Sequence, residues 1–358
     1  MIGAGNIGKT HLTSIVSLRE AQLLDVEVAA ICDIDREALR NSGEFFDVQK
    51  RYEHFTELVE SSDVDVVYIC TPTNLHPEMV RAVVKAAKPV FCEKPLAHTC
   101  AQASDLLTLT KKAGIPAGIG LVLRFDQFIL YAKNLIDTCD LGKPMLVHIR
   151  DDQRIPVGYL YYSQWRGDLS IAGGGTLIEH SIHDIDLLRW FLGDADTVYA
   201  KTSHFSGKAI EDQASLIVTH RNGSIGTLDS VWHWVERPSE RMIEFFFEKG
   251  WIAVKLGSDE HYLEYQLQGG KPVRVTAEMA NPALLERLGL TRDDLSAEGY
   301  ELITSVGNER YLALSYSLLK AIQANRNPSP DFADAVEAHR VVDAAYESAK
   351  KGKLVRIL

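Results

Sequence analysis

Short apolar runs alternate with helix-like stretches over the first part of the chain, up to about residue 123. The runs are dense in valine and isoleucine and do not alternate with polar residues, as is typical of strands buried on both faces. The strand-like runs span residues 26–31, 64–70, 89–92 and 115–123, and the helix-like stretches span 7–18, 36–46, 77–87 and 100–113. This order predicts a parallel sheet with helices on both faces, so we expect residues 1–123 to form one α/β domain.

The pattern changes after about residue 124, where strand-like segments follow one another with few helices between them. Several are joined by short turns, such as residues 221–223, which indicates an antiparallel or mixed sheet. The strand-like segments span residues 145–150, 197–204, 214–220, 224–234, 242–248, 251–256 and 354–357, and helices are expected at 176–191 and 334–351. We interpret residues 258–308 as an insertion with its own small hairpin and helix. Residues 124–358 are expected to form a second, α+β domain.

The composition is that of a globular protein and narrows the classes of partner. Of the 358 residues, 46% are hydrophobic and 24% are charged, and the length suits two domains. A formal net charge of −11 without a basic tract argues against nucleic acid or an anionic membrane as a partner. No apolar run approaches the roughly 20 residues of a membrane-spanning helix, and the N-terminus lacks a secretory signal, so we expect a cytoplasmic protein. The five cysteines form no CxxC pair and are expected to be free thiols in a reducing compartment.

Gly3, Gly5 and Gly8 form a GxGxxG motif that opens a helix, with Asn6 and Ile7 between the last two glycines. In a dinucleotide-binding turn, the first glycine allows a tight turn and the second allows the backbone to approach a pyrophosphate. The third allows the helix to pack on its strand. The free N–H groups and the positive end of the helix dipole then face the phosphates. The motif alone is a weak signal, but the strand expected at 26–31 follows it as the fingerprint requires.

Asp33 follows that next strand-like run. A carboxylate in this place binds both hydroxyls of an adenosine ribose and repels a 2′-phosphate, so NAD is favoured over NADP as the cofactor. The alternative is that Asp33 only caps the next turn.

The first strand of this fold is short, because only Met1 and Ile2 precede Gly3. A buried central strand normally has about five or six residues. We therefore expect either a truncated strand or a start codon placed too late. A chain extended upstream is expected to be more stable and to bind NAD more tightly.

Two polar segments follow consecutive strand-like runs, and open α/β sheets bind ligands at the carboxyl ends of their strands. Residues 71–76 read TPTNLH, and residues 93–95 read EKP. The proline after Lys94 restricts that lysine to an extended or turn conformation. An ordinary lysine, with a pKa of about 10.4, is a poor base at neutral pH, but partial burial and an oxidised nicotinamide ring would both lower its pKa. The alternative is a surface lysine paired with Glu93.

A glycine triplet at residues 173–175 precedes the first helix of the second half. Glu179 and His183 are four residues apart and are expected on one helix face, one turn from each other. The glutamate can orient the imidazole and stabilise its charged form, which suits acid–base catalysis or hydroxyl recognition. His180 and Asp184 form a second such pair. Two alternatives remain, a metal site and a polar helix face with satisfied histidines.

Together these segments resemble the glucose-fructose oxidoreductase, inositol dehydrogenase and rhizopine-catabolism MocA (Gfo/Idh/MocA) family. The motifs GAGNIG, DVDVVYICTPTNLHPEMV, VFCEKPLA, RFDQF, GKP, WRGD and AGGGTLIEHSIHDIDLLRWFLG stand in the family's order and spacing, and the closing AYESAKKGKLVRI is also similar. An EKP motif and a GGG-x3-acid-x3-His motif downstream of a dinucleotide fingerprint are a specific signal. The resemblance covers most of the chain.

The resemblance implies a Rossmann dinucleotide-binding domain followed by an α+β domain with an open, mostly antiparallel sheet. That sheet often forms the family's oligomer interface, which implies a homodimer or homotetramer, and the helix at 176–191 is implied to line the cleft between the domains. The implied NAD contacts are Gly3, Gly5, Asn6, Ile7, Gly8, Asp33, Thr71, Pro72, Asn74, His76, Glu93 and Lys94. The implied substrate contacts are Lys94, Arg124, Trp165 and His183, and the implied catalytic residues are Lys94, His183 and Glu179.

The family's chemistry is hydride transfer. We therefore expect an NAD-dependent dehydrogenase that acts on a secondary alcohol or ketone of a sugar, an inositol or a sugar derivative. No metal is expected, because this chemistry uses a lysine and a histidine instead of a Lewis acid. Many polyol dehydrogenases of the family have aspartate in place of Glu179, and the insertion at 258–308 is longer than usual.

Two alternatives come from other classes. One is a non-catalytic NAD-sensing regulator of the same fold, and the other is an NAD-assisted glycoside-processing enzyme. A small sugar or polyol is the expected partner of the enzyme. Its specificity is expected to depend on the insertion and on Asp151, Asp152, Arg154, Tyr159, Trp165 and His233.

Overall fold

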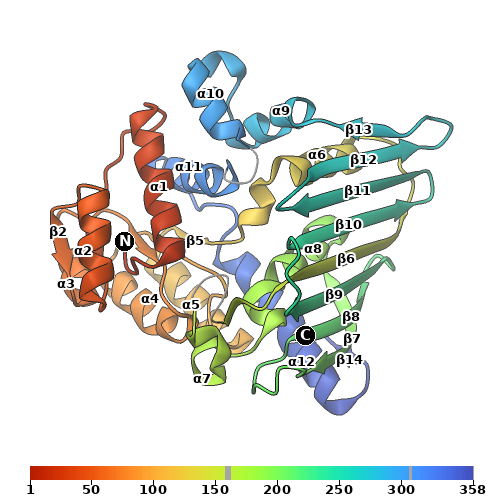
Figure 1. Ribbon diagram of the computed structural model, residues 1–358, viewed down its shortest axis with the longest axis horizontal. Coiled ribbons are helices and arrows are strands. Elements are labelled where there is room, and N and C mark those ends of the chain that lie inside the picture. The colour runs from red at the N-terminus through yellow and green to blue at the C-terminus, as the bar shows by residue number, and fades with distance from the viewer. Residues whose placement is uncertain (158–162, 306–308, 358) are drawn as a thin grey trace. The chain divides into compact units, whose positions relative to one another are not determined.

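The computed structural model describes residues 1–157, 163–305 and 309–357, and the chain forms two compact units (Figure 1). The first unit consists of Met1–Phe125 and Leu288–Val336, and the second consists of Asp126–Arg287 and Glu337–Leu358. The chain therefore enters each unit twice. The candidate specificity residue Tyr159 lies outside the described residues.

The first unit contains the parallel sheet that the apolar runs predicted. Its strands are β1 (Ala30–Cys32), β2 (Lys50–Tyr52), β3 (Val67–Ile69), β4 (Val90–Cys92) and β5 (Ala117–Ile119). β2 pairs with β1, and β3, β4 and β5 pair in this order, all in parallel. Ile2 forms parallel bridges to Cys32 and to Ile69 and so joins the two sets. The resulting order is that of a doubly wound dinucleotide-binding fold, which confirms the predicted Rossmann domain.

Met1, Ile2 and Gly3 occupy the place of the first strand, between β1 and β3. The backbone N–H of Gly3 donates to the carbonyl of Cys32 at 2.8 Å, and the buried Met1 ammonium donates to the carbonyl of Ala30 at 2.9 Å. This pairing sets Gly3 at the carboxyl ends of the neighbouring strands.

Helices and short helical turns flank the strands of the first unit. They are α1 (Asn6–Glu20), α2 (Arg36–Phe45), α3 (Phe55–Glu60), η1 (Thr73–Leu75), α4 (His76–Lys85), α5 (Cys100–Ala113), η2 (Val122–Phe125), η6 (Arg292–Asp294), α10 (Ala297–Thr304) and α11 (Glu309–Gln323). The apolar runs of the sequence extend beyond the observed strands. Residues at their ends, such as Val64 and Leu121, are buried without pairing in the ladder.

Residues 288–336 group with the first unit, whereas the sequence analysis placed all of 124–358 in the second domain. The reason is packing: α11 contacts both α1 and η2. Phe332, at the start of α12 (Phe332–Lys351), lies in the same hydrophobic core as Ile2. The first unit is thus completed by a segment far along the chain, which no local pattern in the sequence indicates.

The second unit is built on one nine-stranded sheet. Its strands are β6 (Pro144–Arg154), β7 (Ala195–Ser203), β8 (Gln213–His220), β9 (Ile225–His233), β10 (Glu240–Phe247), β11 (Gly250–Gly257), β12 (His261–Leu267), β13 (Val273–Val275) and β14 (Val355–Arg356). The spatial order is β13-β12-β11-β10-β6-β9-β8-β7-β14, and only the β6–β9 pair is parallel. The predicted open, mostly antiparallel sheet is confirmed. The hairpin of the insertion, β12 and β13, extends this sheet.

Helices pack on the sheet of the second unit. α6 (Gln127–Thr138) contacts β11 and β12, and α8 (Ile182–Leu192) contacts β6 and β9. The shorter α7 (Leu169–Ala172) follows the 3-10 helix Trp165–Gly167, and α9 (Ala277–Leu288) follows the insertion hairpin. No described helix is both long enough and apolar enough to cross a membrane.

The single helix predicted at 176–191 is wrong, because the segment forms two elements. Thr176–His180 is a π-helix, called the π-turn below, and α8 begins only at Ile182. The N–H of Ser181, between them, bonds to the carbonyl of Thr176 at 2.8 Å, five residues back. The polar contacts that hold the π-turn come from distant segments of the chain, so helical periodicity could not reveal it.

Candidate active site

The glycine turn of the first unit has the steric demands that the motif predicted. Gly3 has a φ of 93°, and a Cβ there would lie 2.5 Å from the carbonyl oxygen of Cys70. A Cβ on Gly8 would collide with the carbonyl of Gly3, whereas a Cβ on Gly5 would meet no atom within 4 Å. Gly5 therefore leaves open space at the start of α1, which begins without a side-chain cap. The turn fits a pyrophosphate against the free N–H groups of the helix.

Asp33 is tied to the glycine turn as well as to its own turn. One carboxylate oxygen accepts from the N–H of Ala4 at 2.7 Å, and the other accepts from the N–H of Asp35 at 2.9 Å. The turn-capping alternative is thus part of the structure. Each oxygen keeps a further lone pair, so the carboxylate can still accept from ribose hydroxyls. Ile34 beside it is 86% exposed, so an apolar surface lies next to the carboxylate.

His76 is buried and bonds to two backbone carbonyls. Its Nδ1 lies 2.8 Å from the carbonyl oxygen of Pro95, and its Nε2 lies 2.9 Å from that of Thr71. Burial lowers the pKa of His76, against the two carbonyls and Glu93, which raise it. The side chain therefore supports the backbone of the TPTNLH and EKP segments and does not face outward. Pro72 is half-buried and Asn74 is exposed, as a ligand-facing segment requires.

Glu93 is 6% exposed and faces the interior, so the surface pair considered for Lys94 does not fit. One carboxylate oxygen lies 2.7 Å from Nε2 of His11 on α1, and the other accepts from the N–H of Lys94 at 3.0 Å. Burial opposes the charged form of Glu93, but the hydrogen bond and charge of His11 and the charge of Lys94 outweigh it, so its pKa lies below the ordinary value. Lys94 itself is half-buried. His11 was missed by the sequence analysis; its only local signal is a polar residue beside the buried Leu12.

Arg124 is a buried cation of the first unit. Its Nη2 donates to Oδ1 of Asp334 at 2.9 Å. The partner is 210 residues away, in the segment that returns to this unit, so the sequence analysis could not name it. The ion pair offsets the cost of burying the guanidinium.

The glycine triplet of the second unit leads into the π-turn and is held by Glu211. This carboxylate accepts from the N–H groups of Gly175 at 2.8 Å and Leu177 at 3.0 Å and from the hydroxyl of Tyr346 at 2.8 Å. Burial raises the pKa of Glu211 despite these donors. A Cβ on Gly175 would collide with the Glu211 carbonyl, which explains the glycine at that position. The sequence analysis missed Glu211 because it lies in a different segment.

Glu179 lies in the π-turn and His183 in the first turn of α8, and both are buried. The break at Ser181 means that their four-residue spacing is not one regular α-helical turn, contrary to the expectation from sequence. Nε of Arg166 lies 3.5 Å from a carboxylate oxygen of Glu179. The guanidinium of Arg166 also lies over the ring of Trp165 at 4.4 Å. Arg166 of the WRGD motif thus contacts both Trp165 and the carboxylate of Glu179.

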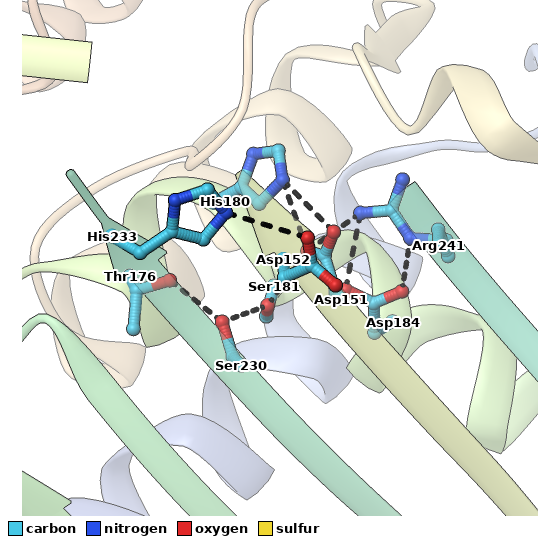
Figure 2. A network of polar contacts seen from close by, with 9 residues as sticks. All are labelled: Asp151, Asp152, Thr176, His180, Ser181, Asp184, Ser230, His233 and Arg241. Carbon is cyan, nitrogen blue, oxygen red and sulfur yellow. Dashed lines mark hydrogen bonds and ion pairs between the residues drawn. The ribbon is translucent and has the colours of Figure 1, made fainter. Parts of the chain in front are cut away.

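A buried polar network lies under the junction of the π-turn and α8 (Figure 2). Oxygens of Asp151 on β6 contact Nε2 of His180 at 2.9 Å, Oγ of Ser181 at 3.1 Å and Nη2 of Arg241 at 2.8 Å. Arg241 on β10 also donates to both oxygens of Asp184, at 2.6 and 3.2 Å.

The pKa values of the two acids of this network are shifted in opposite directions. Burial raises the pKa of Asp151, but the charges of Arg241 and His180 outweigh it and bring the pKa well below the ordinary value. Burial and the nearby charge of Asp151 raise the pKa of Asp184 to about 7, against the opposing charge of Arg241. Asp184 is therefore more easily protonated than an ordinary aspartate, and Asp151 is less easily protonated.

His233 is the last residue of β9, and Asp152 lies near the end of the neighbouring strand β6. The N–H of Val235 donates to Nδ1 of His233 at 3.2 Å, so the hydrogen of the neutral ring is on Nε2, which lies 3.5 Å from Asp152. Arg154 pairs with Glu236 at 3.1 Å. Each of these candidate specificity residues thus lies within ion-pair distance of an oppositely charged or titratable side chain. No group of three or more possible metal ligands occurs in residues 1–157, 163–305 and 309–357.

The fold and the glycine turn define a class of protein, the oxidoreductases with an NAD-binding Rossmann domain. Residues 1–121 match the model of an oxidoreductase family with an NAD-binding Rossmann fold, and residues 129–253 match the Gfo/Idh/MocA C-terminal domain. The chain belongs to the Gfo/Idh/MocA oxidoreductase family. The predicted family, class of enzyme and cofactor are confirmed, and nothing in the comparisons supports the sensor or the glycoside-processing enzyme.

Three of the similar proteins are dehydrogenases with a named substrate. The chain is 29% identical to a myo-inositol 2-dehydrogenase of Thermotoga maritima, over 91% of this chain and 96% of that protein. It is 26% identical to a D-apiose dehydrogenase of Rhizobium rhizogenes, over 92% and 90%. The solved structure of a levoglucosan dehydrogenase with NADH and levoglucosan superposes with a TM-score of 0.85 at 22% identity, over 99% of this chain and 98% of that one.

Proposed function

We propose that this enzyme transfers hydride between NAD and a secondary alcohol or ketone of a sugar, an inositol or a sugar derivative. The observation that carries the proposal is the support of Lys94. Glu93 and His11 hold the backbone on one side of the lysine, and His76 holds the Pro95 carbonyl on the other. A lysine so placed at a strand end, in the unit that carries the dinucleotide turn, suits proton exchange with a substrate hydroxyl. The dehydrogenases of inositol, apiose and levoglucosan among the relatives support a polyhydroxylated substrate.

NAD supplies the hydride chemistry when it is bound, and residues of the first unit form its proposed binding site. The turn at Gly3, Gly5 and Gly8 and the start of α1 would hold the pyrophosphate, and Asp33 would accept from the ribose hydroxyls. The neighbours Asn6 and Ile7, and the 71–76 segment, complete the expected contacts.

Lys94 accepts the hydroxyl proton in the oxidation direction, directly or through His183. Glu179 keeps His183 oriented, and Arg166 in turn fixes the carboxylate of Glu179. Arg124 and Trp165 bind the substrate. In the reverse direction the same groups return the proton to a ketone.

The open face of the sheet supports a homodimer or homotetramer. Ile225, Leu146, Phe246 and Trp251 are directly paired in adjacent strands, and Ile225 and Phe246 are exposed. An apolar row of this kind on a monomer favours association. We also propose a cytoplasmic location, because all five cysteines are free thiols.

A substrate panel tests the proposal directly. The enzyme is incubated with NAD⁺ or NADP⁺ and with myo-inositol, D-apiose or levoglucosan, and NADH formation is measured together with product. At least one member should be oxidised with NAD⁺, and the Lys94→Ala variant should be nearly inactive on it. No oxidation of any member, or product without net NADH, contradicts the proposal. Elemental analysis of the active protein tests the expectation of a metal-free site, since one tightly bound zinc per chain contradicts it.

A further inference from the structure

The ionic cluster of Arg241, Asp151 and Asp184 is buried, although buried ion pairs contribute little to stability. Their desolvation cost is often as large as their attraction, and apolar residues of similar volume often serve the fold equally well. The cluster is also not placed at random, because it lies where the π-turn passes into α8 (Figure 2). These two facts point to a role other than stability.

The guanidinium of Arg241 connects the sheet to the helix. Arg241 and Asp151 stand directly opposite each other on β10 and β6, so their positions are fixed by the strand register. From there the guanidinium reaches Asp184 with Nε at 2.6 Å and with Nη2 at 3.2 Å, while Nη2 also contacts Asp151 at 2.8 Å. A planar guanidinium bound in this way fixes the distance of the first turn of α8 from β6 and β10 and its rotation relative to these strands.

A chain of hydroxyl groups connects the same carboxylate to both ends of the π-turn. Ser181 Oγ lies 3.1 Å from Asp151 and 2.6 Å from Ser230 Oγ, and Ser230 Oγ lies 2.6 Å from Thr176 Oγ1. The Ser181 hydroxyl is the donor toward both the Asp151 carboxylate and Ser230 Oγ, so these two acceptors share its single hydrogen. Between Ser230 and Thr176, either hydroxyl can donate. Thr176 begins the π-turn and Ser181 follows it, so the chain closes the turn.

We propose that Arg241 is a positioning residue for Glu179 and His183. These two residues lie on either side of the junction, one in the π-turn and one in α8, and the cluster fixes the two elements against the same pair of strands. The roles of Glu179 and His183 come from the proposed function, on which the inference rests. Arg241 holds α8 through its contact with Asp184. Through its contact with Asp151, it also holds Ser181 and His180, which bind the same carboxylate.

Amide hydrogen exchange tests the positioning without any substrate. In Arg241→Lys the charge remains but the planar guanidinium is lost, so exchange at residues 176–184 should become roughly tenfold faster while the rest of the second unit is unchanged. Ser181→Ala, which removes only the link to the hydroxyl chain, should accelerate exchange within the same segment. Arg274→Gln is the matched control, because Arg274, on the edge strand β13, also pairs with two carboxylates, Glu264 on β12 and Glu260 just before β12. Unchanged exchange at 176–184 in both variants, or equal acceleration throughout the unit, overturns the inference.

Kinetics on the best substrate of the panel provide the second arm. Arg241→Lys should lower kcat about ten- to a hundredfold, because small misplacement of reacting groups has this effect, with little change in the Kd of NAD. Its pH profile should change shape, whereas a smaller folded fraction would only scale it. A kcat of Arg241→Lys equal to that of the wild type overturns the inference. If the wild type oxidises no member of the panel, the proposed function fails, and the exchange experiment still decides whether Arg241 orders the segment.

Discussion

Lys94 is the residue on which the proposed chemistry depends most directly. Lys94→Ala should lower turnover by roughly two to four decades, because the proton acceptor is lost. The Kd of NAD should change little, since the proposed dinucleotide contacts are the glycine turn, the start of α1 and Asp33. The oxidation rate of the wild type should rise with pH as the base deprotonates. The pH profile of the variant should lack this rise. Lys85→Ala, which changes an exposed lysine of α4, is the control; near-normal turnover of Lys94→Ala contradicts the assignment.

His183 is expected to contribute to both binding and proton transfer. His183→Ala should reduce kcat, with a larger rise in KM if the ring mainly holds a substrate hydroxyl. Steady-state kinetics over a range of substrate concentrations separate the two effects. A variant with unchanged kcat and KM would exclude His183 from the site.

Asp33 is expected to set the preference for NAD over NADP. Asp33→Ser removes the carboxylate that repels a 2′-phosphate, so the ratio of the two dissociation constants should move toward one. NAD binding itself should weaken, because the bond to the N–H of Ala4 is lost at the same time. Titration of NAD and of NADP into the wild type and into Asp33→Ser measures the four dissociation constants. Equal affinities in the wild type would refute the role of Asp33.

Functional residues were predictable from the sequence where a single segment contains the whole motif. Contacts between residues of two distant segments were not predictable. The glycines, Asp33 and the EKP motif are visible as local patterns. His11 and Glu93 form a buried pair although they are 82 residues apart, and Arg124 and Asp334 are 210 residues apart. No local pattern carries such a contact, so these partners came only from the structure.

The same distinction holds for elements. α5 was predicted with its observed bounds because its caps are local: the Thr99 side chain accepts from the N–H of Gln102, and Gly114 has a φ of 67°. The π-turn was missed because Glu211 and Asp151, from other segments of the chain, stabilise it. Ile178, Ile182 and Ile185 are spaced as on one face of a continuous helix, but distant polar partners override that preference.

The junction of the π-turn and α8 gives a pH dependence of stability. The pKa of Asp184 is about 7 in the folded protein and 3.8 for an ordinary aspartate, so the folded state holds a proton that the unfolded state has released. This contribution is fully present below the unfolded pKa and is lost as pH rises through the folded pKa. Asp184→Asn removes this titration, so its stability relative to the wild type should improve from about pH 5 to about pH 8.

Urea denaturation midpoints at several pH values measure this difference. A wild-type advantage that stays constant over the whole range would show that Asp184 is ionised throughout. Asp151, whose pKa is lowered, acts with the opposite sign, but only at acid pH, because its contribution is lost as pH falls.

At the scale of the whole molecule, the apolar row on the open face of the sheet predicts association between chains. Phe246→Asp places a charge in the middle of the row and should shift the protein toward monomer in analytical ultracentrifugation. Phe205→Asp, at a residue that is 76% exposed outside the strands, is the matched control and should leave the assembly unchanged. A wild type that is monomeric at all concentrations contradicts the proposed oligomer.

The alternation of chain segments between the two units bears on how the protein is made. A ribosome delivers residues 1–125 first, yet the core around Ile2 receives Phe332 only after more than half of the chain has followed. Until then the nascent first unit exposes apolar surface that its own segment cannot cover, and such surface promotes aggregation. The early part of the chain is therefore expected to depend on chaperones during synthesis. For the same reason, expression of residues 1–123 alone should give an insoluble fragment, even though the dinucleotide fingerprint is complete within it.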